Sequence, residues 1–299
     1  MRKKGEWFEW NVVKDWENQT IHYVLSEKIG ASKPLIQKLK ENNAIRKNDK
    51  HADVNHLLSK DDRLLLRIFQ DEEYVVTPEY QTIDVLFEDD HLVILNKQAG
   101  IDTHPNEQGQ IGTLANALAS HFQMNGLSIK VSHIHRLDRD TSGAIIFAKN
   151  PLAHAILDKE LHDRTVKRTY LAAVGGKVKR KKERIELSIG RDRHHPTRRR
   201  VSPNGQPAIT NYVVIDYLPK EDISILSLQL ESGRTHQIRV HLSHIGHPII
   251  GDTLYGGSKN LIDRQALHAA KISLIHPITR ESLEISAPVP SDMVRLMGE

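Results

Sequence analysis

Histidine and carboxylate side chains are the first groups in this chain whose spacing suggests a catalytic site. The 299 residues include 18 histidines, and His133 and His135 are followed closely by Asp138. A metal-dependent hydrolase with the motif HxHxDH is one hypothesis, because imidazole and carboxylate groups together bind zinc. The spacing contradicts this hypothesis, since the motif needs aspartate and histidine where this chain has Leu137 and Asp138. We therefore expect no metal site.

Cysteine-based chemistry is excluded by composition. The chain contains no cysteine, which rules out disulfides, thiolate nucleophiles, iron–sulfur clusters and cysteine-ligated zinc. It also has no Gly-rich phosphate-binding loop. The apolar runs are too short to span a bilayer, and the charged N-terminus has no signal-peptide core. We therefore expect a cytoplasmic protein that does not enter a membrane.

Positive charge is concentrated in one segment. The net charge is +4 and the sequence pI is about 9.1. Residues 177–200 alone contain eleven Lys or Arg side chains against three acids. Such a segment can be a solvated basic hairpin, a disordered loop or a surface that binds a polyanion such as RNA.

The most specific signal is the segment HRLDRDTSG at residues 135–143. It resembles the signature HRLDxxTSG of RluA-type pseudouridine synthases and matches it at every fixed position. Residues 233–241, GRTHQIRVH, match a second signature of that family. Four further family motifs (KPAGxxxHP, RTYLA, GDxxYG and LHAxxLxxxHP) resemble residues 97–105, 168–172, 251–256 and 267–277. All six occur in the family's order, from about residue 82 to the C-terminus. One departure is Gln98, where the family has proline, so the turn there can differ.

The resemblance implies an isomerase that converts uridine in RNA to pseudouridine. The reaction breaks the N1–C1′ bond, rotates the freed base and remakes the link through C5. It involves no redox change and no net hydrolysis, so no cofactor is required. The resemblance assigns Asp138 as the nucleophile, a role that a carboxylate can fill. Whether Asp138 attacks the base or the sugar stays open.

Two further residues are implied as partners of Asp138. Burial raises the pKa of a carboxylate and a nearby cation lowers it. The resemblance places Arg239 next to Asp138, and a guanidinium stays charged and can form two hydrogen bonds to a carboxylate. It also places Tyr170 against the target base, where the ring can stack on uracil or the phenol can relay a proton.

The remaining expected residues contact RNA. A base in folded RNA must leave its stack, and Arg136 is the implied wedge that fills the vacated place. Thr141 and Ser142 are also expected to hydrogen-bond within the loop around Asp138. The residues expected to contact RNA or the target base are Arg136, Arg139, Thr141, His104, Arg168, Arg234, His236, Lys179, Arg180, Arg198 and Arg199.

The expected partner is structured RNA, either ribosomal large-subunit RNA or transfer RNA, and not DNA. We expect the protein to act as a monomer. The alternative hypothesis is a non-catalytic RNA-binding or ribosome-assembly factor on the same fold, because fold alone does not determine function. The presence of Asp138, Tyr170 and Arg239 favours the enzyme.

These residues must be positioned by an α+β domain. The resemblance implies a pseudouridine synthase fold, a largely antiparallel mixed sheet flanked by helices, over residues 76–299. Alternation predicts a hairpin at 83–95 and strands at 169–174, 208–217, 223–230, 271–274 and 283–286. Helices are expected after Thr113, from Asn150-Pro151 and over residues 236–245.

A smaller module is expected ahead of the catalytic domain, over residues 20–75. Its pattern is a helix over 21–29, a second helix capped by Ser32, and strands near 44–46 and 64–68. This order resembles the small RNA-binding module of ribosomal protein S-four, although Asn48-Asp49 stands where that module usually has Asn-Gly. Residues 1–19 are expected to form an N-terminal extension.

Overall fold

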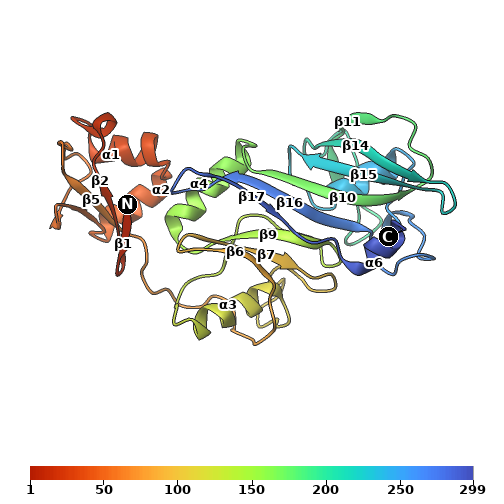
Figure 1. Ribbon diagram of the computed structural model, residues 1–299, viewed down its shortest axis with the longest axis horizontal. Helices are drawn as coiled ribbons and strands as arrows, with labels where there is room; N and C mark the ends of the chain where they lie inside the picture. Colours follow the sequence, from red (N-terminus) through yellow and green to blue (C-terminus); the bar gives the residue numbers. More distant parts are fainter. Residues whose placement is uncertain (299) are drawn as a thin grey trace.

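The protein is elongated, with a small N-terminal module at one end of a larger sheet-based body (Figure 1). The computed structural model describes residues 1–298. We call residues 1–69 the module and residues 82–298 the body. The first strand and the last helix, α6 (Ser291–Leu296), lie at opposite ends of the molecule (Figure 1).

The body is built on a ten-stranded mixed sheet. Its main path has the order β11-β14-β15-β10-β16-β9-β7-β6, while β17 pairs with β16 and β8 pairs with β9. Neighbouring strands are antiparallel except β9 and β16, which are parallel. The expected α+β class and the largely antiparallel sheet are confirmed. The strands are β6 (Val85–Glu88), β7 (Leu92–Lys97), β8 (Ser132–His133), β9 (Ser142–Ala148), β10 (Lys167–Gly175), β11 (Lys182–Glu186), β14 (Ile209–Leu218), β15 (Ile223–Leu230), β16 (Leu267–Ile275) and β17 (Ser282–Ser286).

The first four residues of strand β7 are all apolar because both faces of the sheet are covered there. Helix α3 (Leu114–Met124) packs on the face that carries Val93 and Leu95. Helix α4 (Pro151–His162) packs on the opposite face, against Leu92 and Ile94. Figure 1 shows the two helices on opposite sides of β7 and β9. A strand that is buried on both faces carries a continuous apolar run in its sequence, and polar and apolar residues do not alternate along it.

The predicted helix starts are confirmed by their caps. The Thr113 side chain accepts a hydrogen bond from the Asn116 amide at the start of α3, and Asn150 does the same for Ala153 in α4. Each cap satisfies an amide that the first helical turn leaves without a partner. The helix expected over 236–245 is α5 (Gln237–His244).

The module is a five-stranded sheet with two longer helical segments and a short 3-10 helix (Lys14–Trp16). The sheet order is β1-β2-β5-β3-β4, and Ser32 caps α2 as expected. The elements are β1 (Arg2–Lys4), β2 (Trp7–Asn11), α1 (Ile21–Tyr23), which continues as a wider helical turn over Val24–Ile29, α2 (Lys33–Glu41), β3 (Ile45–Lys47), β4 (Lys50–His51) and β5 (Arg63–Arg67).

The expected N-terminal extension is instead part of the module. Strand β2 pairs antiparallel with β5, so residues 2–11 add two strands to the module's sheet. Phe8 and Trp10 are buried in the module's core, so this segment packs as part of the module. The strands are short and lie among charged residues, so their local sequence pattern does not indicate a strand. Their pairing depends on β5, which lies more than fifty residues away.

The module packs on the body through aromatic and aliphatic side chains. The rings of Phe8 and Phe69 contact His91 of the body at centroid distances of 4.9 and 5.5 Å. Ile156 of α4 and Ile278, before β17, belong to the same buried cluster as the module's core. The two parts therefore share apolar packing at their junction.

The basic segment is divided between two structures. Its first part forms β11 at the edge of the main sheet, paired with β14. Its second part forms a separate two-stranded ribbon of β12 (Ile189–Arg191) and β13 (Arg199–Val201). The basic segment therefore forms paired strands, and the prediction of a disordered loop is wrong. No helix within residues 1–298 is both long and apolar enough to cross a membrane.

Candidate active site

A cleft of about 1280 Å³ on the body contains most of the predicted site residues. Asp138 lies on the loop before β9, Tyr170 on β10 and Arg239 on α5, so three separate elements meet here. The predicted RNA-contacting residues that also line the cleft are His104, Arg136, Arg139, Thr141, Arg168, Arg234 and His236. Lys179, Arg180, Arg198 and Arg199 do not line it.

Arg239 is held between two carboxylates. Its Nη1 donates to Oδ2 of Asp138 at 3.0 Å, and its Nε and Nη2 donate to the two oxygens of Asp252 at 2.7 and 2.9 Å. Asp252 is buried, whereas the Asp138 side chain keeps 26% of its surface exposed toward the cleft. Burial by itself lowers the pKa of Arg239, but the hydrogen bonds and charges of Asp252 and Asp138 raise it above its ordinary value. The guanidinium therefore stays charged and fixed beside Asp138.

Asp252 is a site residue that the sequence analysis did not select. The signal was present, because Asp252 belongs to the segment that resembles GDxxYG. It occupies the buried side of Arg239 in a two-point hydrogen bond, which fixes the plane of the guanidinium. Only Nη1 remains for Asp138.

Lys97 holds the loop that carries Asp138. Its Nζ is fully buried and donates to the backbone oxygens of Gln98, Ile101 and Arg139 at 2.9, 2.7 and 2.7 Å. Burial lowers the pKa of Lys97 to about 8, although the charge of Asp138 acts in the opposite direction. Three carbonyl partners on two loops make Lys97 a structural link rather than a group that faces the cleft.

Thr103 and Gln265 brace the same loop from its other sides. The Thr103 hydroxyl donates to the Leu137 carbonyl at 2.9 Å and accepts from the Leu137 amide at 3.2 Å. Gln265 donates to the Thr141 hydroxyl at 2.9 Å, and the Thr141 amide donates to the Asp138 carbonyl. Thr141 is only 2% exposed, and its hydroxyl accepts the hydrogen bond from Gln265, while its role in RNA contact stays a prediction.

The turn that follows Gln98 is held against the loop that carries Asp138. Gly100 has φ of 90°, and its amide donates to the Arg139 carbonyl at 2.9 Å. In return, Arg139 Nε donates to the Gly100 carbonyl at 3.0 Å. Arg139 is thereby fixed at the rim of the cleft.

Tyr170 is buried in the wall of the cleft. It is 4% exposed, and burial raises the pKa of its phenol, which the Asp138 charge raises further and Arg168 opposes. The phenol therefore stays protonated at neutral pH. Arg168 precedes Tyr170 by two residues on β10, so both side chains lie on the same face of the strand.

Arg136 and His104 lie at the open side of the cleft. Arg136 is exposed, as a residue that inserts into RNA must be. The imidazole of His104 lies 4.9 Å from that of His133, and burial followed by the charge of Arg136 lowers its pKa. His104 is therefore neutral at pH 7.

The basic ribbon is joined to the cleft through Tyr255. The Arg199 amide donates to the Tyr255 hydroxyl at 2.9 Å, and this hydroxyl also pairs with Nδ1 of His236 at 2.9 Å. His236 has φ of 58°, in the left-handed region, at the start of α5. Arg234 donates through Nε to the Pro207 carbonyl at 3.2 Å. The ribbon therefore borders the cleft.

Part of the basic segment is neutralised by its own acids. Arg180 forms an ion pair with Glu183, and Arg184 forms ion pairs with Glu186 and Glu231. Arg198 lies 3.8 Å from Asp192. Fewer free cations are left for RNA than the residue count suggests.

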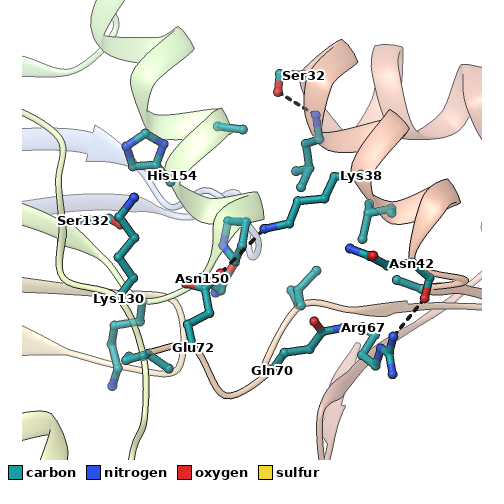
Figure 2. A pocket seen from close by; sticks show the side chains of 18 of the residues that line it. Ser32, Lys38, Asn42, Arg67, Gln70, Glu72, Lys130, Ser132, Asn150 and His154 are labelled. Atoms are coloured by element: carbon teal, nitrogen blue, oxygen red, sulfur yellow. Dashed lines mark hydrogen bonds and ion pairs between the residues drawn. The ribbon is translucent and has the colours of Figure 1, made fainter. Parts of the chain in front are cut away.

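A second hollow of about 350 Å³ lies between the module and the body. Figure 2 shows it between α2 and α4, with Lys38 pointing toward Glu72 and Arg67 toward the backbone of Asn42. None of the predicted site residues line it. No group of three or more His, Asp or Glu side chains within residues 1–298 is arranged to hold a metal ion.

Known proteins that are similar to this chain are RNA pseudouridine synthases. The family of RNA pseudouridylate synthases matches residues 91–244, and the N-terminal domain of the RluD ribosomal pseudouridine synthase matches residues 8–64. The RNA pseudouridine synthase YhcT of Bacillus subtilis is 51% identical over 99% of this chain and 98% of its own length. Ribosomal large subunit pseudouridine synthase D of Nitrosomonas europaea is 42% identical over 72% of this chain and 64% of its own.

Solved structures lead to the same conclusion. Human RNA pseudouridylate synthase domain containing 1 has a TM-score of 0.58 and 28% identity, and the match covers 69% of this chain and 83% of the human one. The sequence, the fold and the cleft therefore agree, and this chain belongs to the RluA-type family of RNA pseudouridine synthases.

Proposed function

We propose that Asp138 is the nucleophile with which this RNA pseudouridine synthase isomerises uridine in structured RNA. The observation that carries the proposal is the arrangement of Arg239, which is fixed by buried Asp252 and donates to Asp138 through its remaining Nη1. A carboxylate that is partly exposed to a cleft and held by a fixed cation is positioned to act as a nucleophile.

The reaction in this proposal conserves all atoms of the nucleotide. The Asp138 carboxylate forms a bond to the target nucleotide, the N1–C1′ bond breaks and the base turns. A C5–C1′ bond then forms, and the bond to Asp138 breaks, which restores the carboxylate. C5 loses its proton and N1 gains one. Attack on the sugar and attack on the uracil ring both place the carboxylate beside the breaking bond. Arg239 supplies charge and position, because a guanidinium does not release its proton at neutral pH.

Tyr170 is proposed to bind the target base. Its raised pKa keeps the hydroxyl protonated, which suits ring stacking and hydrogen-bond donation better than proton abstraction. Arg136 is proposed to fill the place that the base leaves in the RNA, since it is exposed at the open side of the cleft. His104, Arg139, Arg234 and His236 would contact the nucleotides on either side.

The proposed substrate class is ribosomal large-subunit RNA, with transfer RNA as the alternative. The relatives named ribosomal large subunit pseudouridine synthase D and the matched N-terminal domain support ribosomal RNA. We propose that the module and the basic ribbon, with Lys179, Arg180, Arg198 and Arg199, contact RNA phosphates. We also propose a monomer that acts in the cytoplasm, where ribosomes are assembled, and does not act on DNA.

The proposal is tested by comparing RNA from cells with and without the gene. Carbodiimide labelling and primer extension across ribosomal and transfer RNAs report pseudouridine as a stop. We expect one or more stops to vanish on deletion and to return with the wild-type gene but not with Asp138→Ala. Asp71→Ala is the matched control, because Asp71 is an exposed aspartate outside the cleft. A stop that returns with Asp138→Ala would remove Asp138 from the mechanism, and no lost stop would favour a non-catalytic RNA-binding protein.

A further inference from the structure

Arg168 is a buried cation without a charged partner among residues 1–298. It is 7% exposed, the same fraction as Arg239, but it forms no salt bridge with the residues that the structure describes. Its Nε is buried and has no hydrogen-bond partner in that part of the chain. A buried charge without a partner is costly, so such groups are retained where something else compensates them.

His135 is a second unsatisfied group in the wall of the same cleft. It is 6% exposed, and neither ring nitrogen has a hydrogen-bond partner of normal geometry within residues 1–298. Burial, followed by the charges of Arg168 and His133, lowers the pKa of His135 well below its ordinary value, and the nearby backbone of Arg136 opposes this only weakly. The ring is therefore neutral at pH 7 and offers one donor and one acceptor.

The guanidinium of Arg168 lies against a glycine. A Cβ placed at Gly233 would come within 3.5 Å of Nη1 and 3.7 Å of Nη2. Because residue 233 has no side chain, nothing at this position covers the guanidinium. Arg168, His135 and Gly233 all line the cleft that contains Asp138.

We propose that Arg168 and His135 form a binding site for a phosphate group of the RNA strand beside the target uridine. The inference rests on the proposed function of the cleft. Phosphate is the anionic group of RNA, whereas uracil is neutral at pH 7 and would leave the buried cation uncompensated. A guanidinium suits a phosphate because it offers parallel N–H donors, and an imidazole N–H adds one more.

The test measures binding of RNA in which one phosphate has lost its charge. The probe is a hairpin that carries the mapped target uridine or, if no uridine is mapped, an oligonucleotide of nine uridines. Single methylphosphonates are placed 5′ or 3′ of the target or at a remote linkage. For the wild type, we expect one neighbouring methylphosphonate to weaken binding about tenfold or more, as expected for a charged hydrogen bond.

The same binding measurements are then made with the variant Arg168→Gln, which completes a double-mutant cycle between the side chain and the phosphate. We expect this variant to bind the unmodified RNA at least about tenfold more weakly than the wild type does. The methylphosphonate that weakens wild-type binding should cause no further loss of affinity in the variant. The slope of the logarithm of the binding constant against the logarithm of the salt concentration should be about 0.7 smaller in magnitude for the variant than for the wild type. This is the change expected when one contact to a single-strand phosphate is lost. Arg295→Gln is the control, because it removes an exposed positive charge outside the cleft. Unchanged affinity of Arg168→Gln, or equal methylphosphonate penalties in the variant and the wild type, would overturn the inference.

His135→Leu separates binding from a merely structural role. Leucine removes a buried polar group that has no partner, so we expect the melting temperature to stay equal or to rise while RNA affinity falls. A lower melting temperature with unchanged affinity would show that His135 serves the fold alone. All of these readouts are equilibrium binding. They are independent of Asp138-dependent modification, so the inference and the proposed function can fail separately.

Discussion

At the scale of single residues, the cleft contains two arginines that are buried to the same extent and partnered differently. Arg239 has two carboxylates, of which Asp252 is buried and Asp138 faces the cleft. Arg168 has none among the described residues. The first arrangement fixes a catalytic group within the protein, and the second leaves a cation for the substrate. The charge that surrounds an arginine, more than its burial, therefore distinguishes the two roles.

Replacing Asp252 tests the fixed arrangement. We expect Asp252→Asn to lower kcat about a hundredfold with little change in KM, because the guanidinium loses one charged partner and Asp138 loses its orientation. Steady-state pseudouridine formation on the mapped RNA measures this, with Asp71→Ala as the control. A variant with full kcat would show that Asp138 alone positions Arg239.

The pH dependence of RNA binding tests His135. Burial, followed by the charges of Arg168 and His133, holds its pKa well below the ordinary value in the free protein. A bound phosphate would raise that pKa, so RNA binding and proton binding should favour each other. We expect wild-type affinity at constant salt to increase as the pH falls below about 6.5, and His135→Leu to lose that part of the increase. Identical pH profiles for both proteins would contradict the phosphate site.

At the scale of elements, the position of Asp138 depends on the close approach of two parallel strands. Gly143 is the second residue of β9, which follows the loop that carries Asp138, and it pairs with Ala269 of β16. Its φ is 113°, and a Cβ there would lie 2.3 Å from the Ala269 carbonyl oxygen. Only glycine allows both the backbone conformation and the contact.

Gly143→Ala should therefore destabilise the protein by about 3 kcal/mol or more, or prevent folding. The control is Gly126→Ala. Gly126 also has a positive φ, of 68°, but no atom lies within 4 Å of its added Cβ, so we expect a loss of only about 1 kcal/mol. Urea unfolding of the three proteins measures the difference. Equal losses would mean that β16 can move away from β9.

At the scale of the whole molecule, the module is attached to the body around a buried histidine. The rings of Phe8 and Phe69 contact His91, and His91 pairs through Nδ1 with Asn150, the cap of α4. The ring of His276 lies 5.8 Å from His91 and its Nε2 lies 2.7 Å from Asp89. The junction thus combines an apolar contact with groups that titrate.

Acidification should weaken this junction. Burial lowers the pKa of His91 to about 4 from an ordinary value of 6.5, so the folded state favours the neutral ring. The stability from His91 is therefore present above pH 6.5 and is lost as the pH falls toward 4, by up to about 3 kcal/mol. We expect the wild-type melting temperature to fall between pH 7 and pH 4.5, and to fall less in His91→Phe. Some fall should remain in the variant, because His133 and His135 are also buried and neutral. An unchanged slope would show that His91 does not contribute.

Much of this molecule could be predicted from sequence wherever the signal is local. Ser32, Thr113 and Asn150 cap the helices that follow them because a cap needs only an amide three residues away. The motifs around Asp138, Tyr170 and Arg239 indicated the family, and the structure brings all three residues to one cleft. Residues 2–11 were misplaced because β2 pairs with β5, more than fifty residues along the chain.

The sequence by itself determined the class of protein, the helices and the identities of the residues around the cleft. The tertiary structure decided which groups are paired. The resemblance placed Arg239 beside Asp138, but the fold decided that Arg239 gives one hydrogen bond to Asp138, 101 residues away, and two to buried Asp252. Strands β1 and β2 enter the module's sheet through the pairing of β2 with β5, and four of the basic residues that were expected to contact RNA lie outside the cleft. The solitary charge of Arg168 is also a tertiary property, because it depends on which carboxylates the fold brings near. Pairing and burial are set by long-range contacts, and local sequence patterns carry no record of them.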